Sequence, residues 1–146
     1  NITDFKNFDL ITPNEKEARF SLADQDASIS NLTLQLNNQA RSKNLILKLG
    51  ERGLFSMGKT NPNGFALPSF LKNNLVDAVG AGDALLAYAS LSLFSSKSVI
   101  VSSILGSVAA ACECEKDGNI VISPDEVLER LEQIRDSSKY STTTKS

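Results

Sequence analysis

The sequence contains no histidine among its 146 residues. The absence of imidazole excludes histidine acid–base catalysis, Ser–His and Cys–His nucleophile pairs, and the commonest side-chain ligand of transition metals. Any proton transfer at a site in this chain must therefore use a carboxylate, a lysine, a tyrosine or a cysteine.

The sequence also lacks an excess of positive charge and long apolar runs. Its 15 Lys and Arg residues stand against 17 Asp and Glu residues, which gives a net charge of -2. Such a chain does not attract nucleic acid phosphates or an anionic membrane surface through its overall field. No apolar run in the sequence could span a bilayer, and its first residues have neither the basic region nor the apolar stretch typical of a signal peptide, so we expect a cytoplasmic protein.

Cysteine is scarce, and the two that are present lie close together in the sequence. Cys112 and Cys114 fall in a segment with a helical pattern, where residues two apart point in different directions. A structural zinc site normally takes four Cys or His ligands. We therefore expect reduced cysteines, with a metal–thiolate site as the less favoured alternative.

Length and composition predict one domain with a loose end. A chain of 146 residues with 41% hydrophobic residues is sufficient for one core and too short for two. The segment after Asp136 is rich in Ser, Thr and Lys, so we expect a domain over 1–136 and a flexible tail over 137–146. The chain begins at Asn1 rather than Met, which leaves open that it is part of a longer polypeptide.

Hydrophobic spacing and turn residues predict alternating strands and helices. Strands are predicted over 8–12, 45–49, 54–57, 65–67 and 120–122, and helices over 15–20, 28–39, 84–94, 98–115 and from 124 onward. The segment 84–94 is apolar or small almost all round, so that helix is expected to be packed on more than one side. The pattern predicts an α/β fold with a mainly parallel sheet, antiparallel edge strands and helices on both faces.

The segment 76–83, VDAVGAGD, carries the strongest chemical signal. Its glycines open into a predicted helix, where free backbone N–H groups and the helix dipole stabilise an anion such as phosphate. Asp83 opposes that anion, and a catalytic role would explain the conflict. The alternative is that Asp83 complements the helix dipole and the glycines form a turn. Neither a dinucleotide fingerprint nor a Walker A loop fits this segment.

DAVGAGDA at 77–84 resembles the C-terminal signature of the ribokinase-like (PfkB) carbohydrate kinases. Three other segments resemble the family in the right order: TPNEKEA at 12–18, LKLGERG at 47–53, and the small-residue helix at 106–118. The resemblance implies a three-layer ribokinase-like fold and the C-terminal part of such a kinase. Within the family, the heptose-phosphate kinase-like members look nearest.

The resemblance also implies roles at the glycine segment and at the Asn-x-x-Glu motif. Asp83 would act as general base on the acceptor hydroxyl, and the backbone N–H groups of Gly80, Ala81 and Gly82 would form an anion hole for the phosphoryl group transferred from ATP. Two further residues would hold Mg²⁺, namely Asn14 and Glu17. Their spacing alone favours a helix cap instead.

The nucleotide side is implied at two places. Lys48, Gly50 and Gly53 match a strand and turn beside the nucleotide, although a snorkelling lysine and hairpin glycines are the alternatives. Ser107 and Gly118 match positions near the adenine, although helix packing and helix termination are the simpler explanations of small residues there.

Two departures and one omission bear on the function that the resemblance implies. Ala78 stands where the family usually has Thr or Ser, and Tyr88 stands where a small residue is usual. The family's N-terminal half, which supplies most sugar contacts and a lid, has no counterpart in the sequence. We expect a kinase for a sugar or sugar phosphate, with a noncatalytic nucleotide-binding or assembly module as the alternative. A dinucleotide-dependent oxidoreductase is disfavoured, and assembly into a homo-oligomer is left open.

Overall fold

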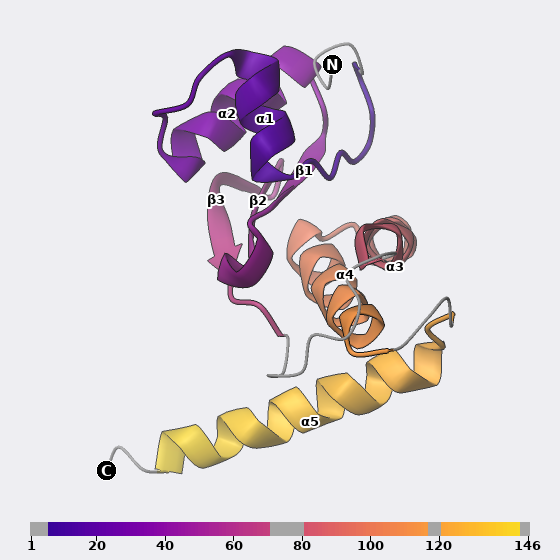
Figure 1. Ribbon diagram of the computed structural model, residues 1–146. Helices are drawn as coiled ribbons and strands as arrows, with labels where there is room; N and C mark the ends of the chain where they lie inside the picture. The colour runs from indigo at the N-terminus through magenta and orange to yellow at the C-terminus, as the bar shows by residue number, and fades with distance from the viewer. Residues whose placement is uncertain (1–5, 71–80, 117–120, 144–146) are drawn as a thin grey trace.

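The computed structural model describes residues 6–70, 81–116 and 121–143 of the chain (Figure 1). The helices are α1 (Glu15–Leu22), α2 (Ile29–Ala40), α3 (Ala81–Ser96), α4 (Val99–Cys114) and α5 (Pro124–Thr143). The strands are β1 (Asn44–Lys48), β2 (Leu54–Gly58) and β3 (Asn61–Leu67), and a short 3-10 turn, η2 (Gly50–Arg52), lies between β1 and β2.

Helix starts coincide with capping residues that the sequence marks. Ser28 caps α2 by accepting a hydrogen bond from the backbone of Asn31, and Ser98 caps α4 in the same way. At α5, the Ser123 hydroxyl accepts from the Glu126 amide, and the Glu126 carboxylate accepts from the Ser123 amide at 2.9 Å. These reciprocal bonds form a capping box, so the predicted start of the last helix is confirmed.

The sheet corrects one part of the predicted topology. The strand order is β1-β2-β3, and both pairs are antiparallel. Among the described residues, parallel pairing is limited to two bridges, Ile11 with Leu45 and Asn14 with Lys48. The short turns after β1 and β2 reverse the chain, whereas parallel neighbours need a long crossover, which the segment containing α1 and α2 supplies. The α/β class and the antiparallel strands are confirmed; mainly parallel pairing is not found among these residues.

The strand predicted at 120–122 is not formed by the described residues of that segment. Val121 and Ile122 are irregular, and Ile120 lies outside the described residues. The hydroxyl of Tyr88 donates a hydrogen bond of 2.9 Å to the carbonyl of Ile122. A side chain on α3 thus takes the acceptor that a neighbouring strand would have used.

The two faces of the sheet are covered by different helices. Leu45 and Leu47 of β1 pack into one cluster with residues of α1 and α2. Ile46, between them, packs into another cluster with Leu85 and Ala89 of α3. Successive side chains of a strand point to opposite faces, so helices lie on both sides of the sheet, as the sequence predicts.

Small residues let α3 and α4 lie side by side, as Figure 1 shows. A Cβ atom on Gly106 would lie 2.9 Å from the carbonyl oxygen of Leu85 and 3.0 Å from the Cβ of Ala89. The buried hydroxyl of Ser102 donates to the carbonyl of Ala89, and Ser103 shares a hydrogen bond with Ser56 of β2. The helix pair is therefore joined to the sheet through close backbone approach and hydroxyl groups.

The outer face of α3 corrects a second expectation. The sequence predicts a helix packed on more than one side, yet Leu91 is 69% exposed and Phe94 is 80% exposed. Leu86 and Ala87 are exposed on the same helix, and Ser90 is a polar residue among them. Because α4 and the sheet occupy only one side of α3, the other side has a largely apolar surface without a covering element among the described residues.

Helix α5 extends further than the composition of its last part suggests. It continues to Thr143, so the segment from 137 onward, predicted as a tail, is helical over most of its length. The hydroxyl of Ser137 donates to the carbonyl of Gln133, a local bond that helices accommodate. Across the described ranges, none of the helices combines the length and apolarity that crossing a membrane requires. Cys112 and Cys114 both lie on α4.

Candidate functional site

The first turn of α3 carries the residues with the strongest chemical signal. The helix begins at Ala81, followed by Gly82 and the exposed Asp83. The first N–H groups of a helix have no partner within the helix, and the dipole makes this end positive. Gly80 lies outside the described residues, so its part in the predicted anion hole stays a prediction.

Lys48 lies against this helix end. Its Nζ atom is 3.4 Å from the position that a Cβ atom on Gly82 would occupy. A lysine ammonium and a helix N-terminus are both positive, and an anion between them would be stabilised by both. The Lys48 ammonium beside this helix end suits a phosphate group.

Asn14 lies beside the backbone of Lys48. It forms the parallel bridge with Lys48, whose amide donates to the carbonyl of Pro13 at 2.9 Å. Lys48 therefore lies beside two other predicted site residues, Asn14 at its backbone and Gly82 at its side-chain end, and these three residues define the Asn14–Lys48–Gly82 corner. They come from the start of α1, the end of β1 and the start of α3.

The predicted metal pair also forms the helix cap that its spacing favours. The side-chain oxygen of Asn14 accepts from the Glu17 amide at 2.7 Å, and the Glu17 carboxylate accepts from the Asn14 amide at 2.8 Å. This is a complete capping box. The cap alternative is confirmed, while the metal role stays a prediction.

The two glycines of the turn after β1 have different environments. Gly53 has φ +88, and a Cβ atom there would lie 2.0 Å from the carbonyl oxygen of Leu67, so only glycine fits. Gly50 has φ +61, yet nothing lies within 4 Å of its Cβ position. Gly53 is thus required by packing against the end of β3, whereas Gly50 keeps open space beside the backbone.

The predicted adenine-side residues are not joined to this corner by the structure. Ser107 is buried on α4, 8% exposed, in the part of the helix that packs inward. Its position fits the helix-packing alternative. Gly118 lies outside the described residues.

Tyr88, where the family pattern has a small residue, fills a structural role. Burial raises the pKa of its hydroxyl, and the neighbouring carboxylate of Glu126 raises it further. The hydroxyl therefore stays protonated and keeps its hydrogen bond to Ile122. This explains how the larger side chain is accommodated between α3 and the segment that leads into α5.

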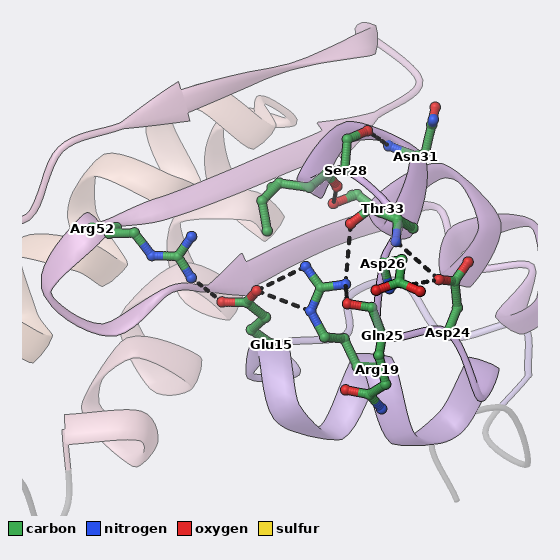
Figure 2. Close-up of polar contacts among 11 residues, drawn as sticks. Glu15, Arg19, Asp24, Gln25, Asp26, Ser28, Asn31, Thr33 and Arg52 are labelled. Atoms are coloured by element: carbon green, nitrogen blue, oxygen red, sulfur yellow. Dashed lines mark hydrogen bonds and ion pairs between the residues drawn. The ribbon is translucent and has the colours of Figure 1, made fainter.

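Sequence reasoning missed a set of charged residues beside the site. Figure 2 shows the Glu15 carboxylate between the guanidinium groups of Arg19 and Arg52. The spacing of Glu15 and Arg19, four residues apart on a helix, is a signal that could have identified that pair. Arg52 is distant in the sequence, and no local pattern marks its contact with Glu15.

Comparison with known proteins gives matches to one family. The sequence profile described as pfkB family carbohydrate kinase matches residues 5–126. No curated protein matches the sequence.

Solved structures of similar fold include ribokinases and phosphofructokinase-2. Ribokinase from Thermotoga maritima is 25% identical with a TM-score of 0.76, and the match covers 90% of this chain and 45% of that one. Escherichia coli phosphofructokinase-2 in complex with potassium is 18% identical, with a TM-score of 0.78 and coverage of 91% and 43%. Arabidopsis thaliana ribokinase complexed with ribose and ATP is 22% identical, with a TM-score of 0.73 and coverage of 84% and 40%. The chain thus spans less than half the length of these structures.

Proposed function

The chain belongs to the pfkB family of carbohydrate kinases, and we propose that it is the nucleotide-binding and catalytic part of an ATP-dependent kinase. In this proposal, residues 1–136 form the C-terminal part of the kinase domain. The acceptor is a hydroxyl of a sugar or sugar phosphate. A heptose phosphate has no support from the ribokinase and phosphofructokinase-2 neighbours, so the proposal keeps the broader class.

One observation carries the proposal: the Lys48 ammonium lies beside Gly82 at the start of α3, with Asp83 in the next position. Backbone N–H groups of this helix end and the lysine would bind the phosphate that is transferred. Such preformed donors stabilise the charge that develops on the phosphoryl group without reorganising. Asp83 is exposed, so an acceptor hydroxyl can reach its carboxylate.

In this proposal, the proton acceptor for the transfer step is a group that this chain holds. The acceptor oxygen forms a bond to the γ-phosphorus of ATP as the bond to the β,γ-bridging oxygen breaks, and ADP leaves. The carboxylate of Asp83 takes the proton from the attacking hydroxyl. A carboxylate is sufficient for this step, which agrees with the absence of histidine from the sequence.

Asn14 and Glu17 fit a magnesium role because both offer oxygen donors, which Mg²⁺ prefers. The capping box occupies one acceptor position on each side chain, and an ionised carboxylate has about four such positions. The two residues would hold the ion through its water shell. Bound Mg²⁺ would neutralise phosphate charge.

The test is Asp83→Asn in the complete encoded polypeptide, assayed for ADP release across a panel of sugars and sugar phosphates. We expect acceptor-dependent turnover to fall by about 10²–10⁴, with ATP binding and the far-ultraviolet circular dichroism spectrum retained. Asp125→Asn is the matched control because Asp125 also lies in the first turn of a helix. Near-normal turnover in Asp83→Asn would overturn the assignment of the base.

The 146-residue chain by itself is expected to bind MgATP weakly and to phosphorylate little. The reason is that the match covers only 45% of the Thermotoga maritima ribokinase chain. Calorimetry with ATP and an ADP-release assay on the isolated chain test this. Robust sugar-dependent ADP release would contradict it.

A second candidate function is a noncatalytic module that binds nucleotide or serves as an assembly surface. The largely apolar outer face of α3 favours this candidate, because exposed apolar helix faces promote association. An assembly surface alone would show no Mg²⁺-dependent affinity for ATP or ADP in calorimetry. Light scattering that gives a clean monomer would argue against self-association. For either function the proposal includes a cytoplasmic location, where thiols such as those of Cys112 and Cys114 stay reduced.

A further inference from the structure

The carboxylate of Glu15 connects two cationic side chains from different parts of the chain. One oxygen accepts from the Nε of Arg19 at 3.0 Å and lies 2.9 Å from its Nη2. The other oxygen is paired with the guanidinium of Arg52, as Figure 2 shows. Glu15 is only 24% exposed and Arg19 only 17%, so this pair is better shielded from solvent than a typical surface ion pair.

Arg19 is itself held at a fixed place. Its Nη1 group donates to the carbonyls of Gln25 and Ala27, at 3.0 and 3.1 Å. The loop that carries these carbonyls is closed by Asp24, whose side chain accepts from the amides of Asp26 and Ala27 (Figure 2). All three guanidinium nitrogens of Arg19 are therefore used, and Glu15 is fixed in one direction.

Arg52 lies at the other end of the connection, on the turn between β1 and β2. This turn is closed by the amide of Leu49 donating to Gly53 at 2.9 Å and by the amide of Gly53 donating to Gly50 at 3.1 Å. The Arg52 side chain is 60% exposed, and its guanidinium contacts Glu15. The ion pair therefore connects the start of α1 with a turn whose own bonds are local.

Residues at the start of α1 contact two neighbouring places, the end of β1 and the turn that follows it. At one point, the backbone of Pro13 and Asn14 pairs with Lys48, the residue that ends β1. At the other, the side chain of Glu15 holds Arg52, four residues further along the chain than Lys48. The first attachment depends on the backbone, whereas the second depends on a single carboxylate.

We infer that Glu15 is a positioning residue that sets the turn of Gly50–Arg52 and Gly53 relative to the Asn14–Lys48–Gly82 corner and so determines the affinity for the nucleotide. The inference rests on the proposed function for its nucleotide part. Glu15 acts through Arg52 and is not assigned a contact with substrate. Gly50, which has open space beside it, is the part of the turn that a ligand could approach.

The experiment compares Glu15→Gln, Arg52→Gln and the double variant. The matched control removes the exposed ion pair of Lys43 and Asp9, again by Lys43→Gln, Asp9→Asn and both together. Two quantities are measured: hydrogen exchange of the Leu49 and Gly53 amides without nucleotide, and kcat and KM for ATP in the complete encoded polypeptide. The exchange measurement needs no activity.

We expect Glu15→Gln and Arg52→Gln each to speed exchange of these two amides and to raise KM for ATP by about three- to tenfold. The value of kcat stays within about twofold because the base and the anion site are untouched. The double variant resembles either single variant, since both remove the same contact. The control pair changes neither quantity.

Unchanged exchange in Glu15→Gln would overturn the claim that Glu15 holds the turn. Additive KM effects would also overturn it, because Arg52 would then act on the nucleotide independently of Glu15. A failure of the proposed function is seen in a separate assay. In that case the Asp83→Asn variant keeps its turnover, or none of the acceptors supports turnover. In that case the nucleotide part of the inference fails, while the exchange result still decides whether Glu15 holds the turn.

Discussion

The helices on the two faces of the sheet are held in place by different kinds of contact. On one face, α1 and α2 combine an apolar cluster with charged side chains, among them Glu15 and Arg19. On the other, α3 and α4 meet through Gly106 and the hydroxyls of Ser102 and Ser103. Ion pairs and helix caps fix the direction of the side chains on the α1–α2 face, whereas close-packed small residues fix the separation of α3 and α4. The candidate site lies where the two meet, at the start of α1, the end of β1 and the start of α3.

The apolar part of the α1–α2 face should give the largest effect on stability. Leu36→Ala removes a fully buried side chain of α2 and should lower the free energy of unfolding by about 2–5 kcal/mol, because it leaves a cavity. Urea denaturation measures it. Leu34→Ala on the same helix is the control, since Leu34 is 45% exposed. Equal losses in both variants would show that the cluster is not the main support of this face.

The α3–α4 face should be broken by a larger side chain at the helix contact. Gly106→Leu places atoms where the Leu85 carbonyl and the Ala89 side chain already lie and should destabilise the fold by about 1–3 kcal/mol. Thermal unfolding measures the change. Ala87→Leu, on the exposed side of α3, introduces the same side chain and should have little effect. A tolerated Gly106→Leu would mean that the two helices can separate without cost.

The helix cap that belongs to the site should give a smaller effect. Asn14→Ala removes the acceptor for the Glu17 amide and should lower the free energy of unfolding by about 0.5–2 kcal/mol. Asn38→Ala is the control because Asn38 is exposed within α2. If denaturation gave the same free energy of unfolding for both variants, the capping box would contribute nothing to the stability of the α1–α2 face.

The smallest effect concerns the stability of the α1–α2 face at acid pH. Hydrogen bonds from the amides of Ala27 and Asp26 hold the pKa of Asp24 below its usual 3.8. A carboxyl with a lowered pKa in the folded state stabilises the protein above the unfolded-state value, and this contribution is lost as pH falls through the folded-state pKa. Asp24→Asn should therefore make stability less dependent on pH below about 4.

Denaturation at a series of pH values measures this dependence. Glu129→Gln, which removes an exposed carboxylate in α5, serves as the comparison. If the loss of stability at acid pH were unchanged in Asp24→Asn and equal to that of Glu129→Gln, the hydrogen bonds to Asp24 would not favour its charged form over its protonated form.

Local signals in the sequence predicted the elements of both faces, because caps and turn glycines act over a few residues. Asn14 and Ser123 start helices as predicted, and Gly53 has the positive φ that its turn requires. The antiparallel strands were predicted, but the mainly parallel pairing is not found among the described residues, because pairing direction depends on which strands become neighbours. The exposed side of α3 was missed for a related reason: an apolar pattern shows that a face is suited to burial without showing what covers it.

The candidate site divides in the same way. The motifs located Asn14, Lys48 and Gly82, and the structure brings these three together. The contact of Glu15 with Arg52 depends on the path of the chain through α1, α2 and β1, and no spacing rule reveals it. The placement of residues 80 and 118, outside the described ranges, stays a prediction.

The two parallel bridges also bear on the order in which the chain folds. The hairpins β1–β2 and β2–β3 join residues close in sequence, whereas the bridge of Asn14 with Lys48 closes a loop of about 30 residues. A contact between distant residues loses loop-closure entropy before it contributes any stabilisation, so such contacts form late. We expect the three antiparallel strands β1, β2 and β3 to pair first and the two parallel bridges to form last. The corner proposed to hold phosphate would then be assembled in the final folding step, and ligand affinity would appear only when folding is complete.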